Sequence, residues 1–237
     1  MNRREFIIAG VALGLYTCRT DKNLLTTSQR IIFIGDSITF QGGYVRNLEL
    51  ELAKKGDFEV FNFGKSSETV SGLSEADHPF PRTVLFERLD KILSTTRPSI
   101  TFLYYGINDG IYSPFNQKRF DAYKNGLDRA INIIHESGSQ IILLTPSPYV
   151  GDNKVNNKNL PLDEYSYKAP YCHYNEEVIR VYAKCILQLG DKRLSRTIDI
   201  YHPLLKNKAI AFDSDPIHPN AIGHKIISDT IKQELNI

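Results

Sequence analysis

The sequence predicts an α/β protein, a three-layer α/β/α sandwich around a flavodoxin-like, five-stranded parallel sheet. Segments of strand length alternate with segments of helical period along the chain, and this alternation is typical of parallel strands joined by right-handed crossovers. The candidate domain, residues 30–237, is shorter than the roughly 250 residues of a closed eight-stranded barrel. An open sheet binds ligands beyond the carboxyl ends of its strands, so functional residues are expected at that edge.

Strands and helices are expected at alternating positions along the domain. Residues 30–35 form a near-continuous apolar run, as expected for a central strand covered on both faces. Gly138 is suited to end a helix and Pro219 to begin one. The five expected strands are residues 30–35, 58–63, 99–105, 140–145 and 197–201. The five expected helices are residues 44–55, 84–93, 120–135, 176–189 and 219–235.

The first 18 residues have the pattern of an export signal. Arg3 and Arg4 precede an uncharged apolar run at residues 6–16. As a helix this run would span about 16 Å, against roughly 30 Å of bilayer hydrocarbon. A signal peptide is therefore expected rather than a spanning helix, with a buried N-terminal helix as the alternative. Residues 19–29 would form a linker to the domain.

Two special forms of export signal fit this segment. Residues 2–7 resemble a twin-arginine signal, with an ordinary secretory signal as an equal alternative. Residues 15–18 resemble a bacterial lipobox, in which Cys18 would carry the lipid, although Thr17 replaces the usual Gly, Ala or Ser. We expect an exported protein, either periplasmic or anchored to the envelope, with a lipid on Cys18 as its contact with the membrane.

Composition argues against several other functions. A formal net charge of +2 without a basic block gives no reason to expect a nucleic-acid partner. No Gly-rich phosphate fingerprint follows the first strand, so no flavin or nucleotide cofactor is expected. Cys172 and Cys185 lie near or within one helical segment, about 20 Å apart, which is too far for a disulfide. We expect two free thiols and no metal site on them.

Polar residues follow three strands and precede the last helix, where the fold would bring them together. They are Ser37, Gly64, Asn108, Asp215 and His218. Each alone is compatible with a turn or a helix cap. Together they supply an acyl-transfer set, because a serine nucleophile needs a histidine base and a carboxylate that orients the histidine. The N–H groups of Ser37 and Gly64 and the amide of Asn108 are candidate oxyanion donors.

These residues and their order resemble the four sequence blocks of the SGNH hydrolase superfamily, also called the GDSL family, over residues 31–224. The resemblance implies a serine esterase without cofactor or metal. It assigns the triad to Ser37, Asp215 and His218, and the oxyanion hole to Ser37, Gly64 and Asn108.

The sequence departs from the family pattern in places that keep every reacting group. Ile38 replaces a leucine, Ser67 stands where many members have a second glycine, and Pro216 replaces the common glycine after the aspartate. Asp213 is a rival to Asp215 as partner of the histidine.

Other functions on this fold are less well supported. A non-catalytic binding module would usually lack a triad residue, and all three are present. A metal hydrolase on Asp213, Asp215, His218 and His224 is disfavoured, because the two histidines are six residues apart and would face away from each other on a helix. His78, in the loop after the second strand, is treated as a loop or surface residue.

The substrate is expected to depend on two loops, residues 65–81 and 146–172. The second is long, polar and rich in tyrosines, at positions 149, 165, 167 and 171. Tyrosines can stack on a sugar, whereas a long acyl chain requires an aliphatic lining. We therefore expect a small-molecule or glycan ester as substrate, most of all short O-acetyl groups on carbohydrates. A lysophospholipase or thioesterase acting on lipid esters is the alternative.

Overall fold

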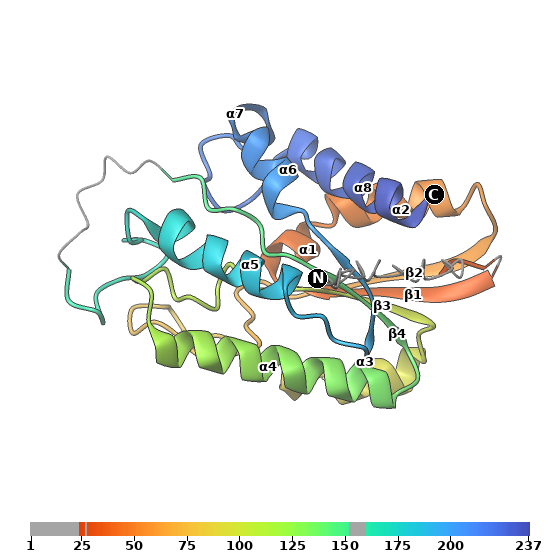
Figure 1. Cartoon of the computed structure of the whole chain (residues 1–237), viewed down its shortest axis with the longest axis horizontal. Helices are drawn as coiled ribbons and strands as arrows, with labels where there is room; N and C mark the ends of the chain where they lie inside the picture. Colours follow the sequence, from red (N-terminus) through yellow and green to blue (C-terminus); the bar gives the residue numbers. More distant parts are fainter. Residues whose placement is uncertain (1–23, 27, 152–159) are drawn as a thin grey trace, which may run out of the picture.

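A computed structural model describes residues 24–26, 28–151 and 160–237 of the chain. Five parallel strands form one sheet in the order β2-β1-β3-β4-β5 (Figure 1). This is the flavodoxin-like order, and the prediction of the fold class is confirmed. The strands are β1 (Ser28–Gly35), β2 (Asp57–Gly64), β3 (Ile100–Tyr104), β4 (Gln140–Leu144) and β5 (Leu194–Ile198).

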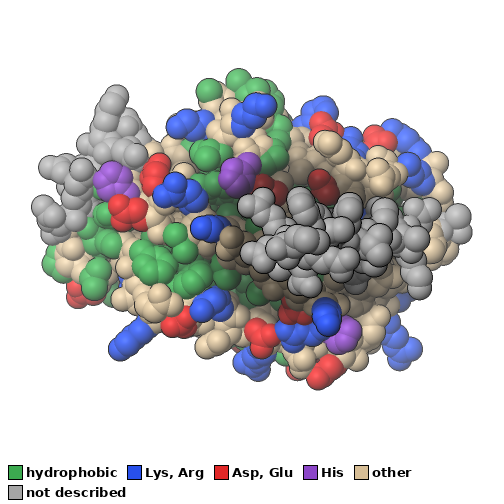
Figure 2. Space-filling model, viewed as in Figure 1, with side chains coloured by type: hydrophobic (Ala, Val, Ile, Leu, Met, Phe, Trp, Pro, Cys, Tyr) green, Lys and Arg blue, Asp and Glu red, His purple; other side chains and the backbone are tan. Residues whose placement is uncertain are grey.

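Helices cover both faces of the sheet, which buries its central strands. All of residues 31–34 in β1 are fully buried, as are most residues of β3 and β4. One helix layer contains α2 (Gly43–Leu52), α6 (Tyr201–Lys206), α7 (Lys208–Ala211) and α8 (Ala221–Leu235). The other contains α3 (Leu89–Thr96), α4 (Gln117–Glu136) and α5 (Arg180–Leu187). Charged side chains of both signs are scattered over the face seen in Figure 2.

Several predicted boundaries are wrong. The strand expected at 197–201 is β5, Leu194–Ile198, because the Thr145 hydroxyl accepts the N–H groups of Ile200 (2.9 Å) and Tyr201 (3.0 Å) and turns the chain into α6. The helix expected at 84–93 is a 3₁₀ turn, η1 (Leu85–Glu87), followed by α3.

The last two expected helices also begin differently. The helix expected at 176–189 starts as a π-helical segment, η2 (Tyr174–Ile179), which continues into α5. Pro219 precedes α8 and does not belong to its first turn. The side chain of Asn220 caps α8 by accepting the N–H groups of Ile222 and Gly223.

Three further expectations concern the end of α4, the two cysteines and the N-terminal segment. Gly138 has a left-handed backbone, with φ of 84°, just beyond the end of α4, as expected of a helix-terminating glycine. Cys172 and Cys185 are free thiols. The signal expected at residues 1–18 lies outside the described residues, and none of the helices described is long and apolar enough to cross a membrane.

The strand order places the site. The chain leaves β1 toward β2 on one side and returns as β3 on the other, so the carboxyl ends of these strands border a crevice. Gly35 and Gly64 are register partners at the ends of β1 and β2, and Tyr104 is the partner of Gly35 at the end of β3. The loops that follow these three residues therefore start side by side.

Candidate active site

Ser37 is the first residue of α1 (Ser37–Gln41), a short helix that begins directly beyond β1. The buried Asp36 caps this helix, because its Oδ1 accepts the N–H of Ile38 at 3.0 Å. Gly35 makes the abrupt turn feasible, since a Cβ there would lie 2.8 Å from the carbonyl oxygen of Tyr104. As the first helical residue, Ser37 has no intrahelical acceptor for its N–H.

Ser37, His218 and Asp215 form a continuous hydrogen-bonded chain. Ser37 Oγ lies 2.8 Å from His218 Nε2, and His218 Nδ1 lies 2.7 Å from Asp215 Oδ2. The carboxylate fixes the tautomer, because Nδ1–H donates to it and leaves Nε2 as the acceptor for the serine proton. The geometry is that of a nucleophile, a base and an orienting acid.

Asp215 is held in the ionised form. Partial burial disfavours the charge, but N–H groups of Ile217 (2.8 Å) and His218 (3.2 Å) donate to its Oδ1, and the His218 ring donates to Oδ2. These donors outweigh burial, so the pKa of Asp215 lies below its ordinary value. The rival carboxylate, Asp213, accepts instead from the side chain of Asn220 at 2.9 Å.

His224 is a packing residue. Its Nδ1 accepts the N–H of Tyr44 at 3.2 Å, so its Nε2–H donates to Gln41 Oε1 at 3.1 Å. Burial, with a smaller effect of His218, lowers the pKa of His224 to about 4, which keeps the ring neutral at pH 7. Among the residues that the structure describes, no group of three or more His, Cys, Asp or Glu side chains could hold a metal ion.

A cavity of about 460 Å³ opens beside Ser37. Of the expected site residues, Ser37, Asn108 and His218 line it, and Asp215 lies directly behind His218. The cavity wall also includes Ser67, Arg82 and Tyr112 from the loops after β2 and β3. The remaining lining residues are Phe40, Gln41, Ser66, His78, Pro79, Phe80, Tyr167 and Ile217.

The structure does not place Gly64 as an oxyanion donor. Gly64 is not among the cavity-lining residues, and its N–H donates to Asn62 Oδ1 at 2.8 Å. A Cβ at this position would lie 2.0 Å from the backbone nitrogen of Phe40. Gly64 is therefore needed because the backbone of α1, which carries Ser37, packs directly against the end of β2.

The loop after β2 offers another backbone N–H to the cavity, that of Ser67. This residue lines the cavity and has a left-handed backbone with φ of 64°. Its N–H has no acceptor within the described parts of the chain. The sequence carried a signal for this role, since Ser67 stands where many family members have a second glycine and glycine adopts positive φ most readily.

Asn108 is oriented by its neighbours and is nearly buried. Tyr112 donates its hydroxyl to Asn108 Oδ1 at 2.9 Å, which identifies the amide oxygen and leaves Nδ2 as the donor end. Nδ2 donates to the carbonyl of Glu68 at 3.3 Å, and its second hydrogen is free to donate to a bound oxygen in the cavity. Ser37, Ser67 and Asn108 thus offer three donors around one cavity.

The two loops expected to shape the cavity are joined to each other. Asp77 Oδ2 accepts the hydroxyl of Ser166 at 3.1 Å, and the carbonyl of Asp77 accepts Lys168 Nζ at 3.2 Å. The rings of His78 and Tyr167 lie 5.6 Å apart. His78 is thus a loop residue, as expected, and it also forms part of the cavity wall.

The tyrosines of the second loop are divided between core and cavity. Tyr165 is fully buried and Tyr149 nearly so, whereas Tyr167 lines the cavity. The asparagine-rich part of that loop, residues 152–159, lies outside the described residues.

Burial raises the pKa of the Asp36 carboxyl to about 7, although the Ile38 N–H favours the ionised form. The folded protein therefore retains a proton on Asp36 between about pH 4 and 7 that the unfolded chain releases. Stability from this group falls as pH rises through that window, by at most about 4 kcal/mol. Asp36→Asn keeps a capping side chain and removes the titration, so its free energy of unfolding relative to wild type should increase from pH 4 to 7.

Urea unfolding of both proteins at one-unit pH steps measures this difference. Asp57→Asn, which changes an exposed carboxylate at the start of β2, is the control and should show no such trend. A difference between Asp36→Asn and wild type that does not change with pH contradicts the buried, protonated state of Asp36.

Comparisons with known proteins agree with this arrangement. The chain matches the model of the GDSL-like Lipase/Acylhydrolase family over residues 33–226. Among curated proteins, none matches the chain. Its fold is similar to that of Axe2, an acetylxylan esterase from Geobacillus stearothermophilus, with a TM-score of 0.62 and 22% identity over 88% of this chain and 94% of that one.

The fold is also similar to that of TesA, with a TM-score of 0.59 and 18% identity over 87% of this chain and 99% of that one. At these identities the likeness shows a shared fold, whereas the family match spans most of the chain. The chain therefore belongs to the GDSL-like lipase/acylhydrolase family and is a carboxylic ester hydrolase with the SGNH hydrolase fold.

Proposed function

We propose that this protein is a serine esterase that removes short acyl groups, above all acetyl, from carbohydrates. The observation that carries the proposal is the hydrogen-bonded chain from Ser37 Oγ to His218 (2.8 Å) and on to Asp215 (2.7 Å) at the edge of the cavity. This geometry activates a hydroxyl for attack on an ester carbonyl.

The reaction proceeds through an acyl-enzyme. His218 Nε2 takes the proton of Ser37 as Oγ attacks the carbonyl carbon, and Asp215 stabilises the resulting imidazolium. The N–H groups of Ser37 and Ser67 and the amide of Asn108 donate to the oxyanion. His218 then protonates the departing alcohol oxygen, and a water molecule activated by the same histidine releases the acid.

The cavity rim supports a sugar as the alcohol part. Phe40 and Phe80 are 64% and 58% exposed although both line the cavity, and Tyr167 lies on its wall. Exposed rings can stack on the apolar face of a pyranose while its hydroxyl groups stay hydrated. A second cavity of about 470 Å³ shares Tyr167 and contains Tyr149 and Tyr171, which suits further units of a glycan.

Two further observations bear on the substrate. Axe2, whose fold this chain shares, is an acetylxylan esterase, which supports an acetylated glycan. Against an acetylated glycan, the cavity lining is more apolar than the loop sequences predict, because it includes Phe40, Pro79, Phe80 and Ile217. This lining favours lipid ester hydrolysis as the second candidate function. We also propose that residues 1–18 direct export, which would bring the enzyme to polymeric glycans outside the cytoplasm.

Asp215→Asn should reduce kcat by several orders of magnitude, because the asparagine no longer fixes the tautomer or stabilises the imidazolium. Asp213→Asn should change kcat by less than about tenfold, since its carboxylate bonds the helix cap Asn220. Initial rates on p-nitrophenyl acetate compare the two variants, with circular dichroism to verify folding. A larger loss from the change at 213 would reverse the roles of the two carboxylates.

Short-chain preference should appear in kcat/KM on acetyl, butyryl, octanoyl and palmitoyl esters of one alcohol. We expect a steady fall in kcat/KM beyond butyryl, because an enzyme for short acyl groups has no site that buries a longer chain. An enzyme with such a site would gain about 0.8 kcal/mol of binding for each methylene buried. A rise toward octanoyl or beyond would move the protein to the lipid ester branch.

The preference for a sugar is tested separately, by replacing an aromatic ring at the cavity and a control ring away from it. Phe80→Ala should raise KM for an acetylated xylo-oligosaccharide several-fold and leave p-nitrophenyl acetate within about twofold, because only the glycan needs the stacking surface. Phe61→Ala, which removes an exposed ring on β2, should change neither. Equal effects of both substitutions on the glycan would argue against a sugar platform at the cavity.

A further inference from the structure

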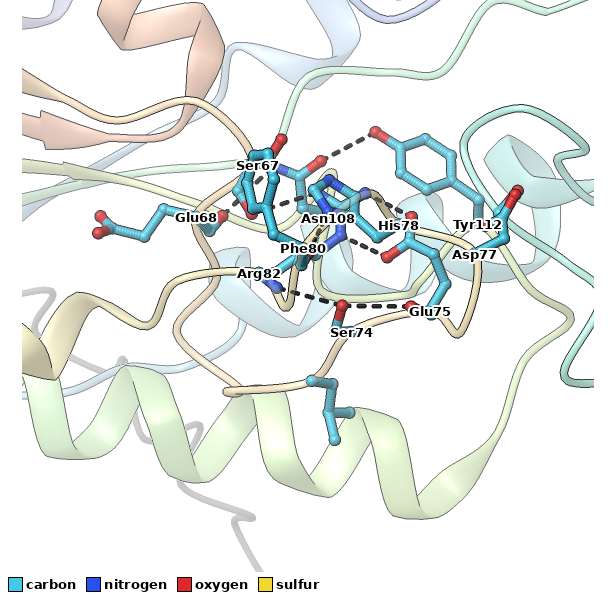
Figure 3. Close-up of polar contacts among 12 residues, drawn as sticks. Ser67, Glu68, Ser74, Glu75, Asp77, His78, Phe80, Arg82, Asn108 and Tyr112 are labelled. Carbon is cyan, nitrogen blue, oxygen red and sulfur yellow. Dashed lines mark hydrogen bonds and ion pairs between the residues drawn. The ribbon is translucent and has the colours of Figure 1, made fainter.

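Tyr112 connects the hydrophobic core to the wall of the active-site cavity. It is only 1% exposed, yet it is among the residues that line the cavity beside Ser37. Its hydroxyl donates to Asn108 Oδ1 at 2.9 Å, and Figure 3 shows this hydroxyl directed at the Asn108 amide. Of the three proposed oxyanion donors, Asn108 alone is a side chain. The contacts that hold its amide therefore decide where this donor points.

Two hydrogen bonds hold the two ends of the Asn108 amide. Nδ2 donates to the carbonyl of Glu68 at 3.3 Å, which is long, whereas Oδ1 accepts the shorter bond from Tyr112. A donor on the amide oxygen also polarises the amide and makes its N–H a stronger donor. Burial raises the pKa of the Tyr112 hydroxyl above its ordinary value, so the proton that Asn108 accepts stays in place. With this single proton on Asn108, Tyr112 has none to donate to a substrate.

The chain presents Tyr112 to Asn108 through a strained turn. The N–H of Ser113 donates to the carbonyl of Gly110 at 3.3 Å, which closes the turn. Its two central residues, Ile111 and Tyr112, have φ of 56° and 51°. Two positive φ angles are the pattern of a type I′ turn, which is dominated by Gly, Asn and Asp. A β-branched isoleucine and a tyrosine are costly there, and such strain persists only where the surrounding structure enforces it.

Aromatic packing holds Tyr112 in this conformation. Its ring stacks on Tyr174, with the centroids 5.0 Å apart, and meets Tyr149 edge-on at 6.3 Å. Its carbonyl accepts the N–H of Tyr171 at 2.8 Å. These contacts fix both the ring and the backbone, so the core enforces the strained turn and directs the hydroxyl at Asn108.

We propose that Tyr112 is a positioning residue of the oxyanion hole, whose hydroxyl holds the Asn108 amide with Nδ2 directed at the substrate oxygen. Because Tyr112 also lines the cavity, a direct contact with the substrate is the competing explanation. The inference rests on the proposed function, since it requires Asn108 to donate to the oxyanion.

A cycle of four proteins separates the two explanations: wild type, Tyr112→Phe, Asn108→Ala and the double variant. Asn108→Ala should lower kcat on p-nitrophenyl acetate by about 10²-fold, as loss of one oxyanion donor does. Tyr112→Phe should lower kcat by about tenfold with KM within about twofold, because the donor is misdirected rather than removed. In the Asn108→Ala background the same change should alter kcat by less than about twofold, because no amide is left to orient.

Tyr201→Phe is the matched control. Tyr201 is also 1% exposed, and its hydroxyl donates to Oδ1 of another asparagine, Asn175, at 3.3 Å. Neither residue lines the cavity that contains Ser37, so kcat should stay within about twofold of wild type. A loss of kcat equal to that of Tyr112→Phe would show a general effect of removing a buried hydroxyl, and it would overturn the proposal.

The cycle itself has three outcomes that contradict the positioning role. An equal loss from Tyr112→Phe in both backgrounds would mean that Tyr112 acts on the substrate directly. A loss that appears mainly in KM would mean that it serves binding. Full activity of Asn108→Ala would remove the donor that it is proposed to hold. If Asn108→Ala does not fold, Asn108→Leu, which keeps the volume and lacks the amide, takes its place.

Thermal unfolding of the four proteins gives a readout that does not depend on activity. Tyr112→Phe leaves a buried amide oxygen without this donor, so it should lower Tm more in wild type than in Asn108→Ala, where that oxygen is absent. Equal changes of Tm in both backgrounds would contradict the coupling of the two side chains, whatever reaction the enzyme catalyses. The proposed function itself fails separately, if Ser37→Ala retains turnover.

Discussion

The active site depends on the packing of the C-terminal helix α8 against α1 and α2. Ser37 and His218 are 181 positions apart in the sequence, so their 2.8 Å hydrogen bond exists only if the two ends of the domain are held in place. His224 makes that contact, joining α8 to the N–H of Tyr44 and to the side chain of Gln41. Gly43 permits it, since a Cβ there would lie 2.7 Å from the His224 ring.

Buried charges beneath the cavity hold backbone groups. The carboxylate of Asp109 accepts the N–H groups of Val70 (3.0 Å) and Ser71 (2.9 Å), and Arg88 bonds both the carboxylate of Glu68 and the carbonyl of Phe63. In a low dielectric such bonds are strong and leave little freedom to the loops they fix. In the loop after β2 these bonds hold Phe63, Glu68, Val70 and Ser71 in place, which favours donors that are arranged before a substrate arrives.

The sheet could be predicted from the sequence because apolar strands and amphipathic helices differ in the period of their apolar residues. The candidate site residues could be predicted because most of them directly follow those strands. Tertiary contacts explain what was missed. β5 ends early because the hydroxyl of Thr145, which directly follows β4, accepts the N–H groups of Ile200 and Tyr201. Gly64 was expected to donate to the oxyanion, and Ser67 was noted only as the replacement of a glycine. Neither the close approach of α1 to Gly64 nor the positive φ of Ser67 is visible in residue type alone.

The central claim is that Ser37 is the nucleophile, and covalent labelling tests it most directly. A fluorophosphonate ester reacts with an activated serine hydroxyl and leaves an adduct that peptide mass spectrometry locates. Ser66 and Ser67 line the same cavity and provide internal controls. The account predicts one adduct per molecule, on Ser37, that is lost in Ser37→Ala and greatly slowed in His218→Ala. Labelling of Ser66 or Ser67, or unchanged labelling of the Ser37→Ala variant, would contradict it.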